Sequence, residues 1–170
     1  MRIPQRLRRE DGAAAVEFAL IVGVLAMLIF GMLQFGLTFF ELQSLRAATR
    51  EGGRLGAVEA TPDAIRSRVE SASNGAVRPG EASNTSFVKV SYSDSGTFTG
   101  SEANLTGNTT PACSSSSSST ADAGVRVQMF IANAPAHLKS LFTLNIPLLP
   151  TISMTPTIDA QFRCEGVNNT

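Results

Sequence analysis

The strongest pattern of hydrophobic positions is an apolar run near the start of the chain. Residues 18–40 carry no charged side chain. A helix of that length rises about 1.5 Å per residue and can cross a hydrocarbon core of about 30 Å. Because small apolar residues precede the run, we expect a transmembrane helix over residues 13–40.

Helical spacing continues after this run with a different surface. Leu42, Leu45 and Thr49 recur at the three- and four-residue spacing of one helical face. Charged residues lie on the opposite face and indicate contact with water. The pattern predicts that the helix protrudes from the membrane over residues 41–60, with a weak point or bend at Gly52–Gly53.

A second, short helix is predicted after the protrusion. Thr61 can cap it, Pro62 suits its first position, and Asp63 suits its positive end. The Asn74–Gly75 pair is a typical stop signal. We therefore expect a short amphipathic helix between these two signals.

From Ala76 onwards, apolar residues recur with a period of two, which is typical of strands. Three segments show this pattern: Phe87–Ser93 through Val88, Val90 and Tyr92; 125–131 through Val125, Val127, Met129 and Ile131; and Ile152–Arg163 through Ile152, Met154, Ile158, Ala160 and Phe162. The sequence predicts an α+β fold in which a roughly three-stranded antiparallel sheet lies within an exported domain over residues 61–170. One of the two helices should cover the apolar face of the sheet.

Two connections in this domain have unusual composition. Residues 94–122 are rich in Ser, Thr, Gly and Asn and include six consecutive serines, Ser114–Ser119. We expect a mobile, exposed loop there, because such a segment buries too little apolar surface to offset its ordering entropy. Residues 136–150 are apolar, and we favour packing under the sheet over a contact surface on a partner or the membrane.

A basic, polar leader, residues 1–12, precedes the apolar helix and ends in Gly12. Glycine has no side chain to block a protease, so the Gly12–Ala13 bond is a candidate cleavage point. Glu17 lies at the edge of the apolar run, where an ionised carboxylate costs a few kcal/mol to bury in lipid. Cleavage would create an α-amino group on Ala13 about one helical turn away, and this ammonium would offset much of that cost.

The order of these features resembles the type IV prepilin signature: a basic leader, Gly12, four small or apolar residues, Glu17 and an aromatic residue heading an apolar helix. The wider pattern GAAAVEFALI…FGMLQFGLTFFELQSLRAATREGGRLGAV resembles the TadE-like pseudopilins of bacterial tight-adherence (Flp, type IVb) pilus systems. The resemblance covers residues 8–58 and implies a pilin-like long helix. It also implies cleavage after Gly12 by a prepilin peptidase, with Glu17 as the acidic residue of the mature N-terminus. Our hypothesis is that Glu17 sets helix register in assembly by pairing with the freed amine of a neighbour.

The partners implied by this resemblance are a prepilin peptidase, other pseudopilins, the major Flp pilin and an inner-membrane assembly platform. The alternative is an uncleaved bitopic membrane protein whose exported domain binds a cell-envelope partner. The first interpretation explains Gly12, Glu17 and the small residues between them together, whereas the second leaves Glu17 unexplained.

Charge is balanced over the whole chain but not along it. Residues 1–12 contain four arginines and two acidic residues. Positively charged flanks stay in the cytoplasm, so we expect a single-pass cell-membrane protein with a cytoplasmic N-terminus and an extracytoplasmic C-terminal domain. A secretory signal peptide, the competing interpretation, would have a shorter apolar core that ends at small residues. Nothing in the charge balance favours nucleic acid.

Both cysteines, Cys113 and Cys164, fall in the exported part. An oxidising compartment permits a disulfide between them, and closing a loop of about 50 residues contributes about 4 kcal/mol in the chain-entropy model. Two unpaired thiols are the alternative, and the sequence leaves both open.

Candidate catalytic residues do not form a recognisable set. The chain has one histidine, His137, and shows neither a Cys-x-x-Cys pair nor a glycine-rich phosphate loop after a predicted strand. It offers few nitrogen, sulfur or clustered carboxylate ligands for a metal. We therefore expect a structural protein rather than an enzyme, without a cofactor.

Overall fold

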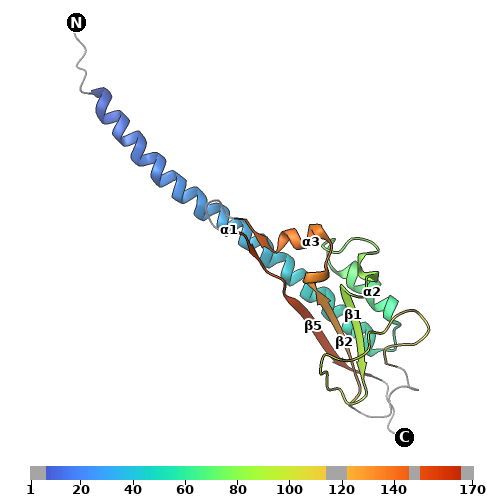
Figure 1. Cartoon of the computed structure of the whole chain (residues 1–170). Helices are drawn as coiled ribbons and strands as arrows, with labels where there is room; N and C mark the ends of the chain where they lie inside the picture. The colour runs from blue at the N-terminus through green and yellow to red at the C-terminus, as the bar shows by residue number, and fades with distance from the viewer. Residues whose placement is uncertain (1–6, 114–121, 146–149, 166–170) are drawn as a thin grey trace.

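The computed structural model describes residues 7–113, 122–145 and 150–165 of the chain. Its longest element is α1 (Leu7–Ala57), a single helix of 51 residues. The N-terminal half of α1 projects away from the rest of the molecule, and its C-terminal half lies against a small folded domain (Figure 1). The predicted long apolar helix is present and continues into the domain without interruption.

The second helix, α2 (Pro62–Ala72), begins where the cap signals predict. The Thr61 side chain accepts a hydrogen bond from the backbone N–H of Ala64 at 3.4 Å, and proline occupies the first turn. Beyond the helix, Asn74 and Gly75 have positive φ angles of 53° and 85°. This left-handed backbone commonly follows a helix, so the stop signal also acts as predicted.

Three strands form an antiparallel sheet in the order β1 (Val88–Ser93), β2 (Gly124–Phe130) and β5 (Thr157–Arg163), with β2 in the centre. The register sets the predicted apolar positions side by side in three rows: Val88, Met129 and Ile158; Val90, Val127 and Ala160; Tyr92, Val125 and Phe162. Helix α1 packs against β2 and β5, and α2 packs against α1 and β1. The α+β class and the three-stranded sheet are confirmed, and both helices cover the sheet.

Two glycines let α1 pack closely between α2 and the sheet. A Cβ added at Gly52 would collide with the Val69 side chain of α2, and one added at Gly53 would lie 2.6 Å from Cδ2 of Phe162 on β5. Helix α1 continues through both glycines. The pair that we expected to weaken or bend the helix is therefore the place where it comes closest to its neighbours.

The last predicted strand is divided into two strands in the structure. The first part, β4 (Ile152–Ser153), pairs with β3 (Thr143–Leu144) in a separate two-stranded sheet, and β5 begins only after Pro156. Proline has no N–H to donate to a strand ladder, which favours a break in the strand at this position. The prediction that Ile152 and Met154 share the buried face of the last strand is wrong, because both side chains are exposed.

The described part of the serine-rich connection, residues 94–113, lies against the domain. The backbone N–H of Leu105 donates to the carbonyl of Val90 at 2.7 Å, and Ala112 is buried. The serine run 114–119 lies outside the described residues. Two short 3-10 helices, η1 (Glu81–Ser83) and η2 (Ile131–Asn133), flank β1 and β2 in the chain.

The apolar connection 136–150 forms α3 (Ala136–Leu141) and then β3, and its residues 146–149 lie outside the described residues. Leu138 and Phe142 are buried in the core. The described part of this connection therefore contributes to the core, where α3 packs mainly against α1, β3 and η2, and Leu141 stays partly exposed.

A buried charge ties α2 to β1. Arg66 is only 2% exposed, and its guanidinium donates to the carbonyls of Val88 at 3.1 Å and Leu105 at 2.6 Å. The Asp63 carboxylate lies 3.3 Å from Nη1. Burial lowers the pKa of the Arg66 guanidinium, and Asp63 opposes this shift. Arg66 acts here as a multiple hydrogen-bond donor that holds a helix, a strand and a loop together.

Candidate membrane and assembly surface

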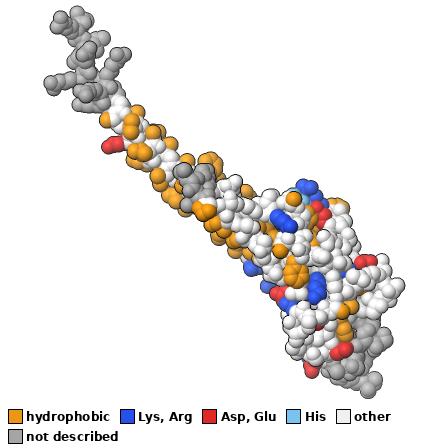
Figure 2. Space-filling view, viewed as in Figure 1, with side chains coloured by type: hydrophobic (Ala, Val, Ile, Leu, Met, Phe, Trp, Pro, Cys, Tyr) orange, Lys and Arg blue, Asp and Glu red, His pale blue; other side chains and the backbone are white. Residues whose placement is uncertain are grey.

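The N-terminal half of α1 presents an exposed apolar surface. Figure 2 shows hydrophobic side chains along the projecting helix, whereas most charged side chains lie on the folded domain. The helix is long and apolar enough to cross a membrane, and its apolar stretch is not buried inside the molecule. Soluble proteins rarely expose a contiguous apolar patch of this kind, so the surface supports membrane anchoring.

The predicted processing and register residues lie at the free end of this surface. Gly12, Ala13 and Glu17 all belong to α1 and are exposed. Among the described residues, nothing lies within 4 Å of a Cβ built at Gly12. Glu17 is flanked by Val16 and Phe18, which are 62% and 67% exposed. The carboxylate therefore lies on a surface that lipid would cover, where a charge is costly without a partner.

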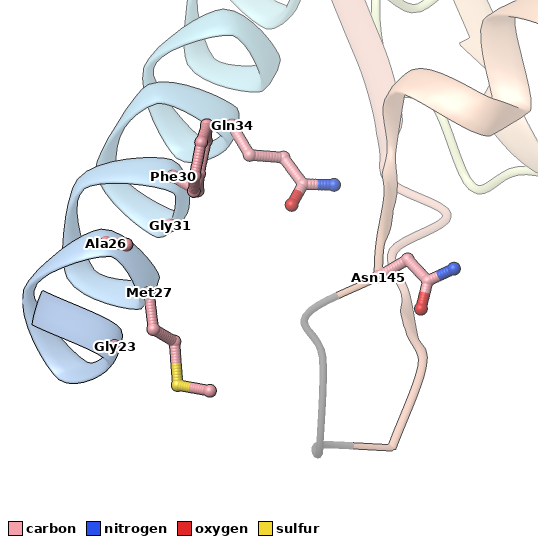
Figure 3. A pocket seen from close by; sticks show the side chains of 7 residues that line it. All are labelled: Gly23, Ala26, Met27, Phe30, Gly31, Gln34 and Asn145. Carbon is pink, nitrogen blue, oxygen red and sulfur yellow. The ribbon is translucent and has the colours of Figure 1, made fainter. Parts of the chain in front are cut away.

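A groove of about 340 Å³ follows the small residues of the same helix. It is lined by Gly23, Ala26, Met27, Phe30, Gly31, Gln34 and Asn145. Figure 3 shows Met27 and Gln34 reaching from α1 toward the segment that carries Asn145. A Cβ added at Gly23 or Gly31 would meet no described atom within 4 Å. These glycines therefore leave space along α1 that the described part of the chain does not fill.

Two polar side chains of α1 join the helix to the segment formed by α3 and β3. Oγ1 of Thr38 donates to the carbonyl of Leu141 at 2.8 Å, and it also lies 3.0 Å from the carbonyl of Gln34. Nε2 of Gln34 reaches the carbonyl of Thr143 at 3.5 Å. The folded domain thus contacts α1 inside the apolar run, before Phe40. Sequence reasoning assigned no role to Thr38, because a polar residue in an apolar run carries no sign of a distant partner.

A second groove, of about 450 Å³, opens where the helix meets the domain. Its lining is almost entirely apolar and comes from α1, the end of α3 and the segment after β4: Phe35, Thr38, Phe39, Leu42, Phe142, Met154, Thr155 and Pro156. The groove lies directly beside the Thr38 hydrogen bond. Sequence reasoning missed it because the division of the last strand at Pro156 turns Met154 outwards.

The opposite end of α1 has a polar character. Glu51 accepts a hydrogen bond from Nη2 of Arg68 on α2 at 2.6 Å, and Arg54 lies 3.9 Å away on the same helix. The hydrogen bond and the charge of Arg68 lower the pKa of the Glu51 carboxyl. A shallow groove of about 530 Å³ next to this pair runs to Phe162. Its charged rim is typical of a solvated face.

Cys113 and Cys164 form a disulfide in the structure, with their Cα atoms 5.6 Å apart. Both residues are buried. The next residue, Glu165, donates its backbone N–H to the carbonyl of Ala57 at the end of α1, at 2.8 Å. The disulfide therefore fixes the end of β5 to the long connection after β1, and the Glu165 hydrogen bond holds the same end against the last turn of α1.

Metal-ligating groups do not gather in the described ranges. Within residues 7–113, 122–145 and 150–165, no group of three or more His, Cys, Asp or Glu side chains could hold a metal ion. The single histidine, His137, lies 3.5 Å from Glu81 and near the carbonyl of Ala76. These contacts connect α3 to η1 and to the loop that follows α2.

Comparison with known proteins bears on the same helix. Neither the curated proteins nor the solved structures that were searched gave a match. The model of one protein family, described as TadE-like protein, matches residues 12–54. The matched segment runs from Gly12, through Glu17 and the apolar run, to the glycines that pack against α2 and β5. The chain thus carries a TadE-like region over residues 12–54, in agreement with the resemblance of its sequence.

Proposed function

We propose that the chain is a TadE-like pseudopilin that contributes to a tight-adherence (Flp) pilus, or to a related secretion apparatus, through packing rather than catalysis. The observation that carries this proposal is the TadE-like match on a helix whose apolar surface is exposed. Together these findings support a membrane-anchored component related to Tad pili. The finer proposal adds cleavage after Gly12 by a prepilin peptidase, and an extracytoplasmic folded domain.

The proposed mechanism is electrostatic and steric. Cleavage would place a new ammonium on Ala13, one helical turn from Glu17 of the same chain or beside Glu17 of a packed neighbour. In lipid, pairing of the two charges offsets a burial cost of a few kcal/mol, so only one axial register of neighbouring helices is favourable. The space beside Gly23 and Gly31 would then accept a neighbouring helix at close range.

Replacement of Gly12 by leucine tests the processing step. The side chain should block access to the scissile bond, so Gly12→Leu should accumulate in membranes at its full mass. Gly23→Leu is a matched control, because it adds the same side chain at another exposed glycine of α1. Normal processing of Gly12→Leu would remove the peptidase from the proposal.

Replacement of Glu17 by alanine tests the register step. Glu17→Ala should still be cleaved, fully or in part, but much less of it should be recovered with the assembled apparatus. Glu41→Ala removes a carboxylate from the other end of the apolar run and should assemble normally. Full assembly of Glu17→Ala would exclude the register role. If the chain is instead an uncleaved bitopic membrane protein, Gly12→Leu and Glu17→Ala should both leave the mass of the protein and its recovery in membranes unchanged.

A further inference from the structure

We propose that the protein contacts the bilayer through its folded domain as well as through α1. The contact is made by apolar side chains that surround the point where α1 leaves the bilayer. This membrane-contact face consists of Phe35 and Phe39 on α1, Leu141 at the end of α3, Ile152 on β4, and Met154. The proposed occupant is the lipid of the leaflet on the domain side. The inference requires only that α1 crosses the membrane, and it depends neither on cleavage nor on a pilus.

The geometry of α1 places this face at the level of the lipid surface. At about 1.5 Å per residue, the helix rises about 26 Å from Glu17 to Gln34 and about 32 Å from Glu17 to Thr38. A hydrocarbon core is about 30 Å thick. With Glu17 at one boundary, Gln34 and Thr38 therefore lie at the other. These are the two residues that hold the α3–β3 segment against α1.

The hydrogen bonds at this level suit a lipid boundary. Thr38 is 7% exposed, and its hydroxyl donates to the carbonyl of Leu141 at 2.8 Å. The short β3–β4 ladder and the N–H of Met154, which donates to the carbonyl of Phe142 at 2.9 Å, satisfy further backbone groups of the same segment. Paired backbone groups are the condition for polypeptide to enter the apolar edge of a bilayer.

The side chains of the face are apolar and lie outside the core. Ile152 is 51% exposed and Met154 is 38% exposed. Met154 lines the groove of about 450 Å³ that runs between α1 and the segment after β4. The groove is continuous with the apolar surface of the transmembrane segment through Phe35 and Phe39. A lipid chain that covers this segment would therefore also reach the groove.

Charge along the chain favours the same occupant. The sequence contains no acidic residue between Asp122 and Asp159, a stretch that includes α3, β3 and β4. Lys139, two positions before Leu141 on α3, is exposed. An exposed ammonium next to apolar side chains is complementary to an anionic lipid headgroup above its acyl chain. An acidic patch at this position would instead have been repelled by such a surface.

Tryptophan fluorescence of the full-length protein in vesicles tests the contact directly, because the chain contains no native tryptophan. Ile152→Trp reports on the face, and Leu141→Trp gives a second position. Val58→Trp is the matched control. Val58 is 53% exposed and directly follows the C-terminal end of α1, on the far side of the folded domain from the transmembrane segment. Phe30→Trp marks the bilayer interior. Each variant is placed in vesicles of phosphatidylglycerol and phosphatidylethanolamine that carry bromine either near the carbonyl end or near the methyl end of the acyl chains.

We expect Ile152→Trp and Leu141→Trp to emit at shorter wavelength than Val58→Trp and to lose fluorescence mainly to bromine near the carbonyl end. Phe30→Trp should be quenched mainly by the deeper bromine, and Val58→Trp by neither. A circular-dichroism melt equal to that of the native chain shows that each variant is folded. Emission from both face positions like that of Val58→Trp would overturn the inference. Blue-shifted emission that lipid bromine does not quench, and that grows with the protein-to-lipid ratio, would overturn it in favour of a neighbouring protein.

Discussion

At the scale of single residues, the same residue type performs different tasks on α1 and α2 according to what surrounds it. Arg66 is buried and donates to carbonyls of β1 and of the following loop, whereas Arg68, two positions later, pairs with Glu51 at the surface. Gly52 and Gly53 are pressed against neighbouring side chains, whereas a Cβ at Gly31 meets no described atom within 4 Å. Helical spacing alone does not separate these cases, because it reports which face a residue occupies and not what covers that face.

The arginine pair gives a prediction for stability. Arg66→Ala should lower the free energy of unfolding by about 2–3 kcal/mol, because it leaves the Val88 and Leu105 carbonyls without their guanidinium donors. Arg68→Ala should cost less than about 1 kcal/mol, because its ion pair is exposed. Chemical denaturation of the full chain in detergent, followed by circular dichroism, measures both. Equal losses would contradict the role assigned to Arg66.

The glycines give a second prediction. Gly52→Ala should lower the free energy of unfolding by about 1–2 kcal/mol, since overpacking against Val69 costs more than the gain of about 1 kcal/mol in helix propensity. Gly31→Ala has space and should leave unfolding of the domain unchanged. The same denaturation experiment compares them, and a stabilised Gly52→Ala variant would show that α1 and α2 can separate without cost.

At the scale of elements, the sequence predicted those features of helices and strands that depend on local signals. The cap at Thr61, the stop at Asn74–Gly75 and the period-two rows depend on neighbours in the chain, and the structure confirms them. The division of the last strand depended on Pro156, whose missing N–H matters only once a partner strand is known. Alternation continued across that proline, so the pattern concealed the break.

The contact between α1 and α3 could not be predicted from local signals either, because Thr38 and its partner Leu141 are far apart in the chain. Thr38→Val removes the hydroxyl that donates to Leu141 and should cost about 1 kcal/mol. Amide hydrogens of α3 and β3 should then exchange faster, while those of β2 keep their protection. Thr143→Val is the control, because its hydroxyl donates to the carbonyl of Lys139 in the preceding turn and does not reach α1. Unchanged exchange in α3 would show that the apolar contacts alone hold α3 against α1.

At the scale of the whole molecule, one helix is shared between two environments. Its N-terminal half exposes apolar side chains, and its C-terminal half forms part of the core of the α+β domain. The C-terminal half of the helix is held against the sheet by the contact of Gly53 with Phe162 and by the hydrogen bond from Glu165 after β5. The sequence predicted the apolar half and the protruding half of this helix separately, but the close packing of the second half against α2 and the sheet follows only from the assembled fold.

The disulfide should make a large contribution to the stability of this assembly. Cys113 and Cys164 are separated by 51 positions, and closing a loop of that size corresponds to about 4 kcal/mol in the chain-entropy model. The double variant Cys113→Ser with Cys164→Ser should therefore unfold at clearly lower denaturant concentration than the native chain. A reducing agent should lower the midpoint of the native chain and leave that of the double variant unchanged. Equal midpoints for the oxidised native chain and the double variant would contradict this contribution.

The most direct test of the proposed function is the N-terminal sequence and intact mass of the protein recovered from its native membrane. Cleavage after Gly12 predicts a mature chain that begins at Ala13 and has lost the mass of residues 1–12. That result would establish processing of the prepilin type and provide the free amine that the Glu17 register requires. A membrane-bound chain that still carries Met1 to Gly12 would contradict the account and favour an uncleaved anchor whose folded domain binds a cell-envelope partner.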